Sequence, residues 1–183
     1  MKSLFKVLSL VLLFSTTASV QAGVLVEPLI GLNFNHKIEG GGEDVSGLGG
    51  AWGGRLGYQN YGFQLGLDYL SSSTDMDESK LKNNFKSQDW AAFVGFEFPI
   101  LVRVYAGYIF SSTGEVNTKS SGKAKFKDGT GTKIGIGFTG LPFIDINVEY
   151  RRGTYDDVKF GSDKGGKQDF SATMISLSLP LNL

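Results

Sequence analysis

The sequence predicts an all-β protein, an eight-stranded antiparallel up-and-down transmembrane β-barrel formed by residues 23–183 behind a signal peptide in residues 1–22. Three observations lead to this prediction. Eight segments alternate between apolar and polar residues, the period of a strand with two unlike faces. The connections between them are alternately long and short, as in a membrane barrel with short turns on one side and long loops on the other. The charged residues of these segments share one face, which leaves the other face wholly uncharged.

The C-terminal stretch 170–183 shows the alternation most clearly. One face is entirely aliphatic and contains Ile175, Leu177, Leu179, Leu181 and Leu183. The opposite face is mostly small or polar and contains Met174, Ser176, Ser178, Pro180 and Asn182. We interpret this pattern as a strand that separates hydrocarbon from a polar interior.

The N-terminus has the three parts of a secretory signal peptide. Lys2 and Lys6 supply positive charge, the run 7–14 is apolar, and Val20-Gln21-Ala22 places small residues at the positions that precede cleavage. This apolar run is too short to span a bilayer as a helix. The mature chain is therefore expected to begin near Gly23 as a single domain.

The composition excludes several functional classes. The formal net charge is +0, which gives no basis for nucleic-acid binding. With 0 Cys there is no disulfide, free thiol, Cys-based metal site or lipoprotein anchor. Mean hydropathy is −0.04, and Gly accounts for 26 of 183 residues, a high share that fits strands that bend and pack closely. We expect no cofactor and no metal.

The predicted strands are each about ten residues long, the length that crosses a bilayer at the tilt of a barrel. They cover 24–36, 50–59, 62–70, 89–98, 101–110, 129–139, 143–151 and 170–183. The long connections are expected to be loops, with no apolar periodicity in 111–128 in particular, and cover 37–49, 71–88, 111–128 and 152–168.

Nine charged residues lie on the polar face of the predicted strands: Glu27, Arg55, Asp68, Glu97, Arg103, Lys133, Asp145, Glu149 and Arg151. A small eight-stranded barrel has an interior just wide enough for side chains to fill. Burying an unpaired ion costs roughly several kcal/mol, so these groups are expected to neutralise one another in a network within the lumen.

Aromatic residues gather near both ends of the apolar face, as expected for two belts at the lipid headgroups. On the side of the long connections they are Phe34, Trp52, Tyr69, Trp90, Tyr108, Phe110 and Tyr150. On the side of the short turns they are Tyr58, Phe63, Phe96, Phe98, Phe138 and Phe143.

The signal peptide, the eight amphipathic strands and the terminal ISLSLPLNL together resemble the small eight-stranded bacterial outer-membrane β-barrels, the family of OmpX, OmpW and the transmembrane domain of OmpA. The resemblance implies a monomer in the outer membrane of a Gram-negative bacterium, in contact with outer-membrane lipid and lipopolysaccharide. It also implies that periplasmic chaperones and the barrel-assembly machinery handle the chain, with the terminal aliphatic face as the assembly signal. The chain departs from the family pattern at Leu183, where an aromatic residue is usual.

We expect a barrel with a plugged, charged lumen and a structural or surface-interaction role, and no enzyme. A narrow or gated pore for small solutes, in which the same ion pairs exchange partners, is the main alternative. A soluble secreted lipocalin-like binder is a remote alternative that requires the reverse sidedness, with apolar side chains inside.

A lipid-A-modifying enzyme is the other remote alternative, because His36 is predicted to face outward at the loop end of the first strand. Ser171 or Thr173 of the last strand and Glu39 are conceivable partners for it. The family's catalytic motif requires a hydroxyl residue two positions after the histidine, and Ile38 stands at that position here.

The lysine-rich connection allows two interpretations that both stay open. Lys119, Lys123, Lys125 and Lys127 either meet phosphates of lipopolysaccharide just above the membrane, or they keep a solvated loop from aggregating.

Overall fold

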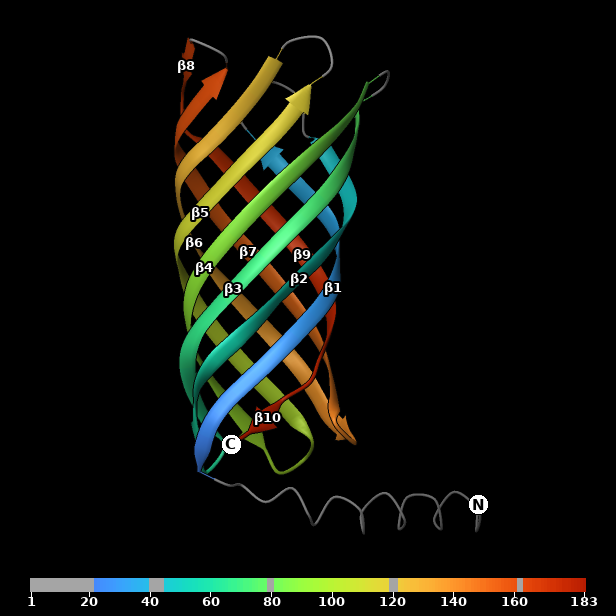
Figure 1. Cartoon of the computed structure of the whole chain (residues 1–183), viewed down its shortest axis with the longest axis vertical. Helices are drawn as coiled ribbons and strands as arrows, with labels where there is room; N and C mark the ends of the chain where they lie inside the picture. Colours follow the sequence, from blue (N-terminus) through green and yellow to red (C-terminus); the bar gives the residue numbers. More distant parts are fainter. Residues whose placement is uncertain (1–21, 40–44, 79–80, 119–121, 161–162) are drawn as a thin grey trace, which may run out of the picture.

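The computed structural model is a closed antiparallel barrel, and it describes residues 22–39, 45–78, 81–118, 122–160 and 163–183 (Figure 1). Its strands are β1 (Gly23–Glu39), β2 (Val45–Asn60), β3 (Phe63–Glu78), β4 (Leu81–Phe98), β5 (Val102–Thr118), β6 (Gly122–Leu141), β7 (Ile144–Phe160), β8 (Asp163–Gly165), β9 (Gln168–Ser178) and β10 (Leu181–Asn182). In the described part of the chain, no helix is long and apolar enough to cross a membrane. The expected signal peptide falls almost wholly on residues 1–21, outside the described residues.

The strands follow one another around the barrel in chain order, which confirms the predicted eight-stranded up-and-down topology. Each of β1 to β7 pairs with its neighbours in sequence, and β9 pairs with both β7 and β1 to close the barrel. The short strand β8 lies outside this circuit and pairs with the upper end of β7.

The closing strand is interrupted, whereas the sequence predicts one continuous strand over 170–183. The ladder between β9 and β1 ends with Ser178 opposite Leu29, and β10 resumes it with Leu181 opposite Val26. The register is unchanged across the gap, where Leu179 N donates to Pro28 O at 3.0 Å. Pro28 and Pro180 both lack an N–H, so the ladder has too few donors there to continue unbroken.

The turns at the lower end of the barrel in Figure 1 are as short as predicted. Tyr61 and Gly62 connect β2 to β3 with φ values of 47° and 83°, the combination that a two-residue hairpin turn requires. Glu97 N on β4 donates to Gly62 O at 2.8 Å, which ties this turn to the neighbouring hairpin. The other two turns lie at residues 99–101 and 142–143.

The four long connections are mostly strand, so the prediction of loops there is wrong. The connection predicted at 71–88 is a β-hairpin in which β3 and β4 pair up to Glu78 and Leu81. The connection at 111–128 is likewise built from β5 and β6, and it does contain inward apolar residues, Ala124 and Phe126. Its outward residues are polar, so the alternation continues there without an apolar outer face.

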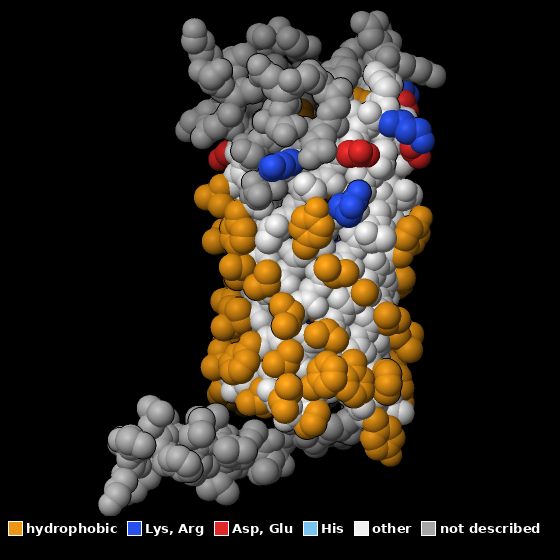
Figure 2. Space-filling view, turned by 180° about the vertical axis from the view of Figure 1, so that it is seen from behind, with side chains coloured by type: hydrophobic (Ala, Val, Ile, Leu, Met, Phe, Trp, Pro, Cys, Tyr) orange, Lys and Arg blue, Asp and Glu red, His pale blue; other side chains and the backbone are white. Residues whose placement is uncertain are grey.

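The sidedness of the wall is the one expected for a membrane barrel. Leu177 is 45% exposed and Val104 is 40% exposed on the outside, while Arg103 is 1% and Glu149 is 2% exposed on the inside. Apolar side chains cover the lower wall, and charged ones gather only towards the upper end (Figure 2). A lipocalin-like binder needs the opposite arrangement, so that alternative is wrong.

We predict that Ile136→Arg destabilises the barrel by about 2–4 kcal/mol in lipid, because Ile136 faces outward between the two aromatic groups and its replacement puts a charge in hydrocarbon. The free energy of unfolding in phospholipid vesicles, followed by urea titration, measures this cost.

Thr130→Arg is the matched control, because Thr130 faces outward on the same strand but above the aromatic belt. We expect it to cost no more than about 1 kcal/mol. Equal costs at the two positions would contradict the assignment of the outer face to lipid.

Candidate functional site

Charged side chains point into the lumen along the lower and middle part of the barrel. Four cations and five carboxylates are buried there: Arg55, Arg103, Lys133, Arg151, Glu27, Asp68, Asp89, Asp145 and Glu149. Eight of them belong to the nine predicted from sequence, and Asp89 is additional. The ninth predicted residue, Glu97, is half-buried near the turns and accepts a hydrogen bond from Gln59 at 3.5 Å. No ion pair joins Glu97 to another described residue.

Arg55 on β2 is the centre of this network. It makes ion pairs with Glu27 on β1 (Nη1 to Oε1, 3.1 Å) and with Asp68 on β3 (Nε to Oδ2, 3.2 Å). Its remaining nitrogen, Nη2, lies 3.3 Å from Glu149 Oε2 on β7. Glu27 and Asp68 stand on the strands that flank Arg55, whereas Glu149 comes from a strand that does not pair with β2. One guanidinium therefore joins separate parts of the wall across the lumen.

Arg103 on β5 makes a second bridge, to β1. Its two terminal nitrogens donate to the two oxygens of Glu27 at 2.9 and 2.7 Å, the bidentate geometry of the strongest arginine–carboxylate pairs. The same guanidinium donates to Asn147 Oδ1 at 2.6 Å and lies 3.4 Å from Asp145 Oδ2. Glu27 is thus shared by Arg55 and Arg103, which couples the two bridges.

Lys133 and Arg151 extend the network upward. Lys133 Nζ donates to Asp68 and to Glu149, the latter at 3.1 Å. Arg151 donates to Asp89 Oδ2 at 2.6 Å and to Asn33 Oδ1 at 2.7 Å. Asp89 alternates with Ala91 and Phe93 on the inner face of β4, so strand periodicity alone could have found it.

Tyr105, an inward-facing residue of β5, also lies within the network. The ring centroid is 4.2 Å from Arg55 Cζ and 5.6 Å from Lys133 Nζ, distances at which a cation is attracted to the face of an aromatic ring. Gly135, opposite Tyr105 on β6, leaves room for the ring, because a Cβ at that position would collide with it. The glycine thus admits the aromatic residue to the lumen.

An apolar cluster lies above the charges. It comprises Phe85, Ala91, Ile109, Ala124, Phe126, Tyr155, Val158 and Phe170. The ring centroids of Phe126 and Tyr155 are 5.3 Å apart, and those of Tyr155 and Phe170 are 4.8 Å apart. Five of these eight residues lie in stretches that the sequence predicts to be loops, so this second layer was missed.

A serine links the two layers. Ser112 Oγ donates to Asp89 Oδ1 at 2.6 Å and lies 3.0 Å from the Tyr155 hydroxyl. The polar edge of the apolar cluster is therefore hydrogen-bonded to the top of the charge network.

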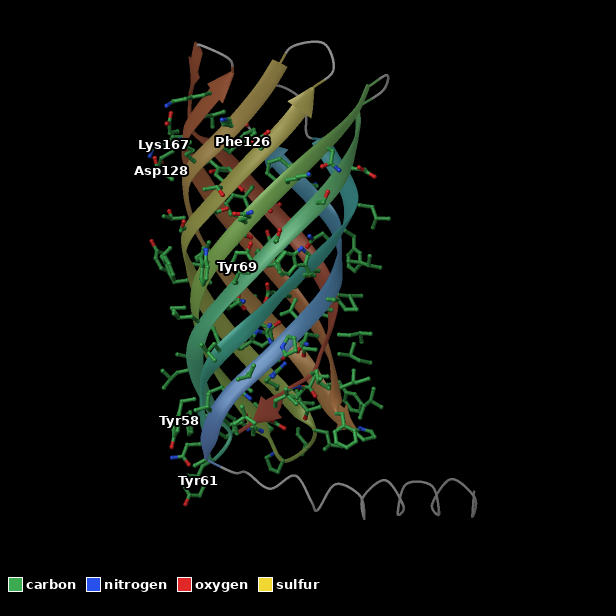
Figure 3. The ribbon with its side chains drawn as sticks, viewed as in Figure 1. Tyr58, Tyr61, Tyr69, Phe126, Asp128 and Lys167 are labelled. Atoms are coloured by element: carbon green, nitrogen blue, oxygen red, sulfur yellow. The ribbon has the colours of Figure 1, made fainter. Side chains whose placement is uncertain are left out.

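The predicted aromatic belts correspond to two groups of touching rings on the outer wall. Tyr69 contacts Trp52 and Trp90, with ring centroids 5.8 and 4.8 Å apart. Near the turns, Phe96 contacts Phe63 and Phe98 at 4.7 and 4.8 Å. In Figure 3 Tyr58 and Tyr61 lie near the turns and Tyr69 lies well above them. The other predicted belt residues that are exposed at the surface are Tyr108, Phe110, Tyr150, Phe138 and Phe143.

The aliphatic residues of the last strand also face outward: Ile175, Leu177, Leu179, Leu181 and Leu183. Leu183, the final residue, is held to β1 by two backbone hydrogen bonds with Val24, of 2.9 and 3.0 Å. The expected assembly signal is therefore an ordered part of the closing seam.

The upper rim carries charged pairs exposed to solvent. Lys159 and Asp157 are 3.3 Å apart, and Lys167 Nζ lies 2.8 Å from Asp156 Oδ1. The hydrogen bond to Asp156 raises the pKa of Lys167. Exposed pairs of this kind contribute little to stability.

The residues considered for catalysis lie at the seam of β1 and β9. Backbone pairing sets Phe34 opposite Thr173 and Lys37 opposite Ser171, with a bulge between them that contains His36. The side chains of His36 and Glu39 are outside the described residues. Among the residues that are described, no group of three His, Cys, Asp or Glu side chains is placed to hold a metal ion.

Fold and site together define an integral β-barrel with an apolar outer wall and a charged interior. The profile of the outer membrane protein beta-barrel domain family matches residues 8–181, so the chain belongs to that family. Family membership indicates the outer membrane of a Gram-negative bacterium. No curated protein matches the chain.

Two solved structures share this fold. Neisserial surface protein A (NspA) is 15% identical, with a TM-score of 0.61, over 87% of this chain and 98% of that one. Ail, the attachment invasion locus protein of Yersinia pestis, solved in complex with the heparin analogue sucrose octasulfate, is 14% identical, with a TM-score of 0.60, over 87% and 99% of the two chains. At these identities the likeness shows the fold alone.

We predict that Arg103→Met lowers the free energy of unfolding by about 3–5 kcal/mol, because it leaves the buried carboxylate of Glu27 with half its partners. Equilibrium unfolding in lipid vesicles measures the change.

Lys159→Met is the control, since it breaks only an exposed pair and is expected to cost no more than about 1 kcal/mol. A cost for Arg103→Met as small as that of the control would mean that the network does not hold the barrel together.

Proposed function

We propose that the protein is a sealed outer-membrane barrel with a structural or surface-interaction role, and not a passage for solutes. The observation that carries the proposal is the set of bridges made by Arg55 and Arg103, which run across the lumen from β2 and β5 to carboxylates on other strands. A solute on its way through would have to separate these buried pairs, at a cost of several kcal/mol, roughly, for each ion left unpaired.

The apolar cluster around Phe126 and Tyr155 supports the same proposal. It lies in series with the charge network along the barrel axis and excludes ions for a different reason, because an apolar constriction offers them nothing to replace their hydration. Any solute path would therefore need both layers to open.

The extent of the barrel supports the surface role. The strands continue well above the upper aromatic group, and their outer face there is polar, so this part of the wall stands above the hydrocarbon. Ail and NspA share the fold, and their names describe an attachment protein and a surface protein. By analogy, the extension is the part of this protein that meets other molecules.

A gated pore is the second candidate, and one observation favours it. The Nε atom of Arg103, Nδ2 of Asn33 and Oγ of Ser176 are buried without a hydrogen-bond partner among the described residues. Unused donors beside the ion pairs offer alternative partners, as the exchange of partners in a gate requires.

The remaining aspects of the role follow from this proposal. We take the protein to be a monomer without enzymatic activity that contacts outer-membrane lipid and lipopolysaccharide through its belts and extension. We take the aliphatic face of β9 and β10 to be the signal that periplasmic chaperones and the barrel-assembly machinery recognise. The mass of lipid A from cells that express the protein tests the absence of activity. A mass shift that appears with the parent protein and disappears with His36→Ala would show that the protein is an enzyme.

Planar-bilayer recording of the refolded protein tests the sealed lumen, and we expect no steady single-channel steps. Replacement of Arg55 and Arg103 by Ser removes the bridging side chains, and we expect it to produce such steps when it is combined with Phe126→Ser, which opens the apolar layer as well. Lys159→Ser, on the outer rim, is expected to stay silent. Reproducible steps from the unaltered protein would favour the gated pore.

A further inference from the structure

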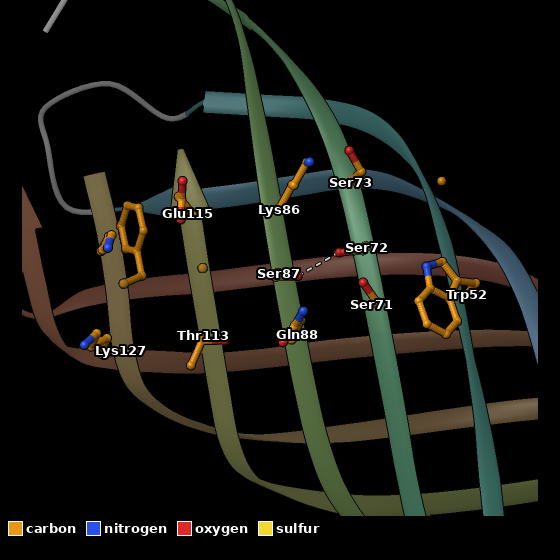
Figure 4. A pocket seen from close by; sticks show the side chains of 14 residues that line it. Trp52, Ser71, Ser72, Ser73, Lys86, Ser87, Gln88, Thr113, Glu115 and Lys127 are labelled. Carbon is orange, nitrogen blue, oxygen red and sulfur yellow. Dashed lines mark hydrogen bonds between the residues drawn. The ribbon is translucent and has the colours of Figure 1, made fainter. Parts of the chain in front are cut away.

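A groove of 860 Å³ lies on the outer wall of the barrel, above the upper aromatic group and across β2 to β6 (Figure 4). Most of the side chains that line it are outward-facing, among them Trp52, Ser71, Lys86, Gln88 and Lys125. Its volume falls within the range of about 300–1,000 Å³ that is typical of small-molecule sites. The charge network within the lumen does not contribute to it.

Bulges account for the hollow. The pairing of β4 with β5 shifts between Trp90 and Ala91, and the pairing of β5 with β6 shifts on both sides of Ser112. A bulge bends its strand and increases the local twist, so the wall curves here. Gly50 has no side chain and Ser73 has a short one, so little projects into the groove at these two positions.

Two rows of side chains cross the groove, set by the strand register. The upper row passes from Ser73 to Lys86, Glu115 and Lys125 on successive strands. The lower row begins at Trp52 and passes to Ser71, Gln88 and Thr113. The upper row thus carries three of the four charged groups of the groove, whereas the lower row offers an indole, two hydroxyls and an amide.

The groove is positively charged. Lys86, Lys125 and Lys127 line it against a single carboxylate, Glu115. None of the three lysines is in an ion pair with another residue in the described part of the chain. The nearby Lys159, by contrast, is paired with Asp157. Unpaired lysines around hydroxyl and amide groups suit an anion that also carries hydroxyls, such as a phosphorylated sugar.

Trp52 offers an exposed indole on which a sugar ring can pack, and it also shows where the groove lies relative to the membrane surface. Its side chain is 61% exposed at the lower rim of the groove, where the apolar face of a pyranose can pack on the indole. Because Trp52 also belongs to the upper aromatic belt, this rim lies at the level expected for lipid headgroups. The groove opens sideways from the wall, so its ligand lies beside the barrel in the same leaflet.

We infer that this groove binds the phosphorylated sugar headgroup of lipopolysaccharide in the protein's own membrane. The lysines pair with the phosphates, the hydroxyl and amide groups bind sugar hydroxyls, and Trp52 supports a ring. The inference rests on the proposed surface role and assigns a specific site to the contact with lipopolysaccharide. It also gives Lys125 and Lys127 the first of the two roles that the sequence left open.

The test is the affinity of the full-length refolded barrel, in detergent micelles, for a short-chain lipopolysaccharide that retains its inner phosphates, measured by microscale thermophoresis. We expect the Lys86→Gln, Lys125→Gln double variant to bind about tenfold more weakly, since each exposed ion pair contributes up to ~1 kcal/mol. Ser71→Phe, which fills the groove without changing its charge, is expected to weaken binding as well. Lys167→Gln, outside the groove, is expected to bind like the parent.

Two further ligands identify the source of the anion. Dephosphorylated lipopolysaccharide is expected to bind as weakly to the parent as the intact form binds to the double variant. Free sucrose octasulfate is expected to compete poorly, because it lacks the acyl chains that hold a headgroup beside the wall.

Equal binding of intact and dephosphorylated lipopolysaccharide, or no effect of the double variant, would overturn the inference. Tighter binding of the free polysulfate than of lipopolysaccharide would also overturn it, in favour of a soluble anionic saccharide. The bilayer recordings are independent of these measurements. A barrel that conducts ions but still binds lipopolysaccharide through its phosphates would therefore overturn only the proposal of a sealed lumen.

Discussion

The sharing of Glu27 between Arg55 and Arg103 is the interaction on which the rest of the structure depends. These three side chains come from β1, β2 and β5, and their pairs at 2.7 to 3.1 Å join these three strands across the lumen. Burial of ions is costly, so such a network stabilises a barrel only when nearly every charge is matched. The requirement for matched partners fixes the register, because a shift of one residue would move every charge on a strand into lipid.

The charge network also explains the glycines and aromatic residues around it. A closed wall of eight strands has little interior volume, and Arg55 and Tyr105 share it closely, with Arg55 Cζ 4.2 Å from the centre of the Tyr105 ring. Gly135 leaves room for the ring of Tyr105, because a Cβ at this position would collide with it. At this level, as in a soluble core, a small residue on one strand makes room for a large side chain on the next.

The membrane-spanning half of the barrel could be predicted from sequence because two environments act on it at once. Lipid selects apolar residues such as Ile136 on one face, and the lumen selects charges such as Arg103 on the other. Above the membrane the outer face meets water, so Ser71, Lys86 and Lys125 give no apolar signal, and the strands there were taken for loops. The inward-facing Asp89 follows the same alternation along β4, so its place in the network could also have been predicted.

Partners within the network could not be predicted, because they depend on closure. Glu149 reaches Arg55 only once β9 has joined β1 and the strand stagger is set. The groove was unpredictable for a similar reason. It arises from bulges around Ser112 that align residues from five strands, and no local pattern in the sequence marks a bulge of this kind.

A double-mutant cycle between Glu27 and Arg103 tests the central claim most directly. The free energy of unfolding in lipid is measured for the parent, Glu27→Gln, Arg103→Met and the double variant. If this bridge holds the strands together, the coupling energy lies towards the upper end of the range of about 0.5–3 kcal/mol found for contacting residues. A coupling energy near zero would contradict the account, since it would mean that the two side chains do not depend on each other in the folded barrel.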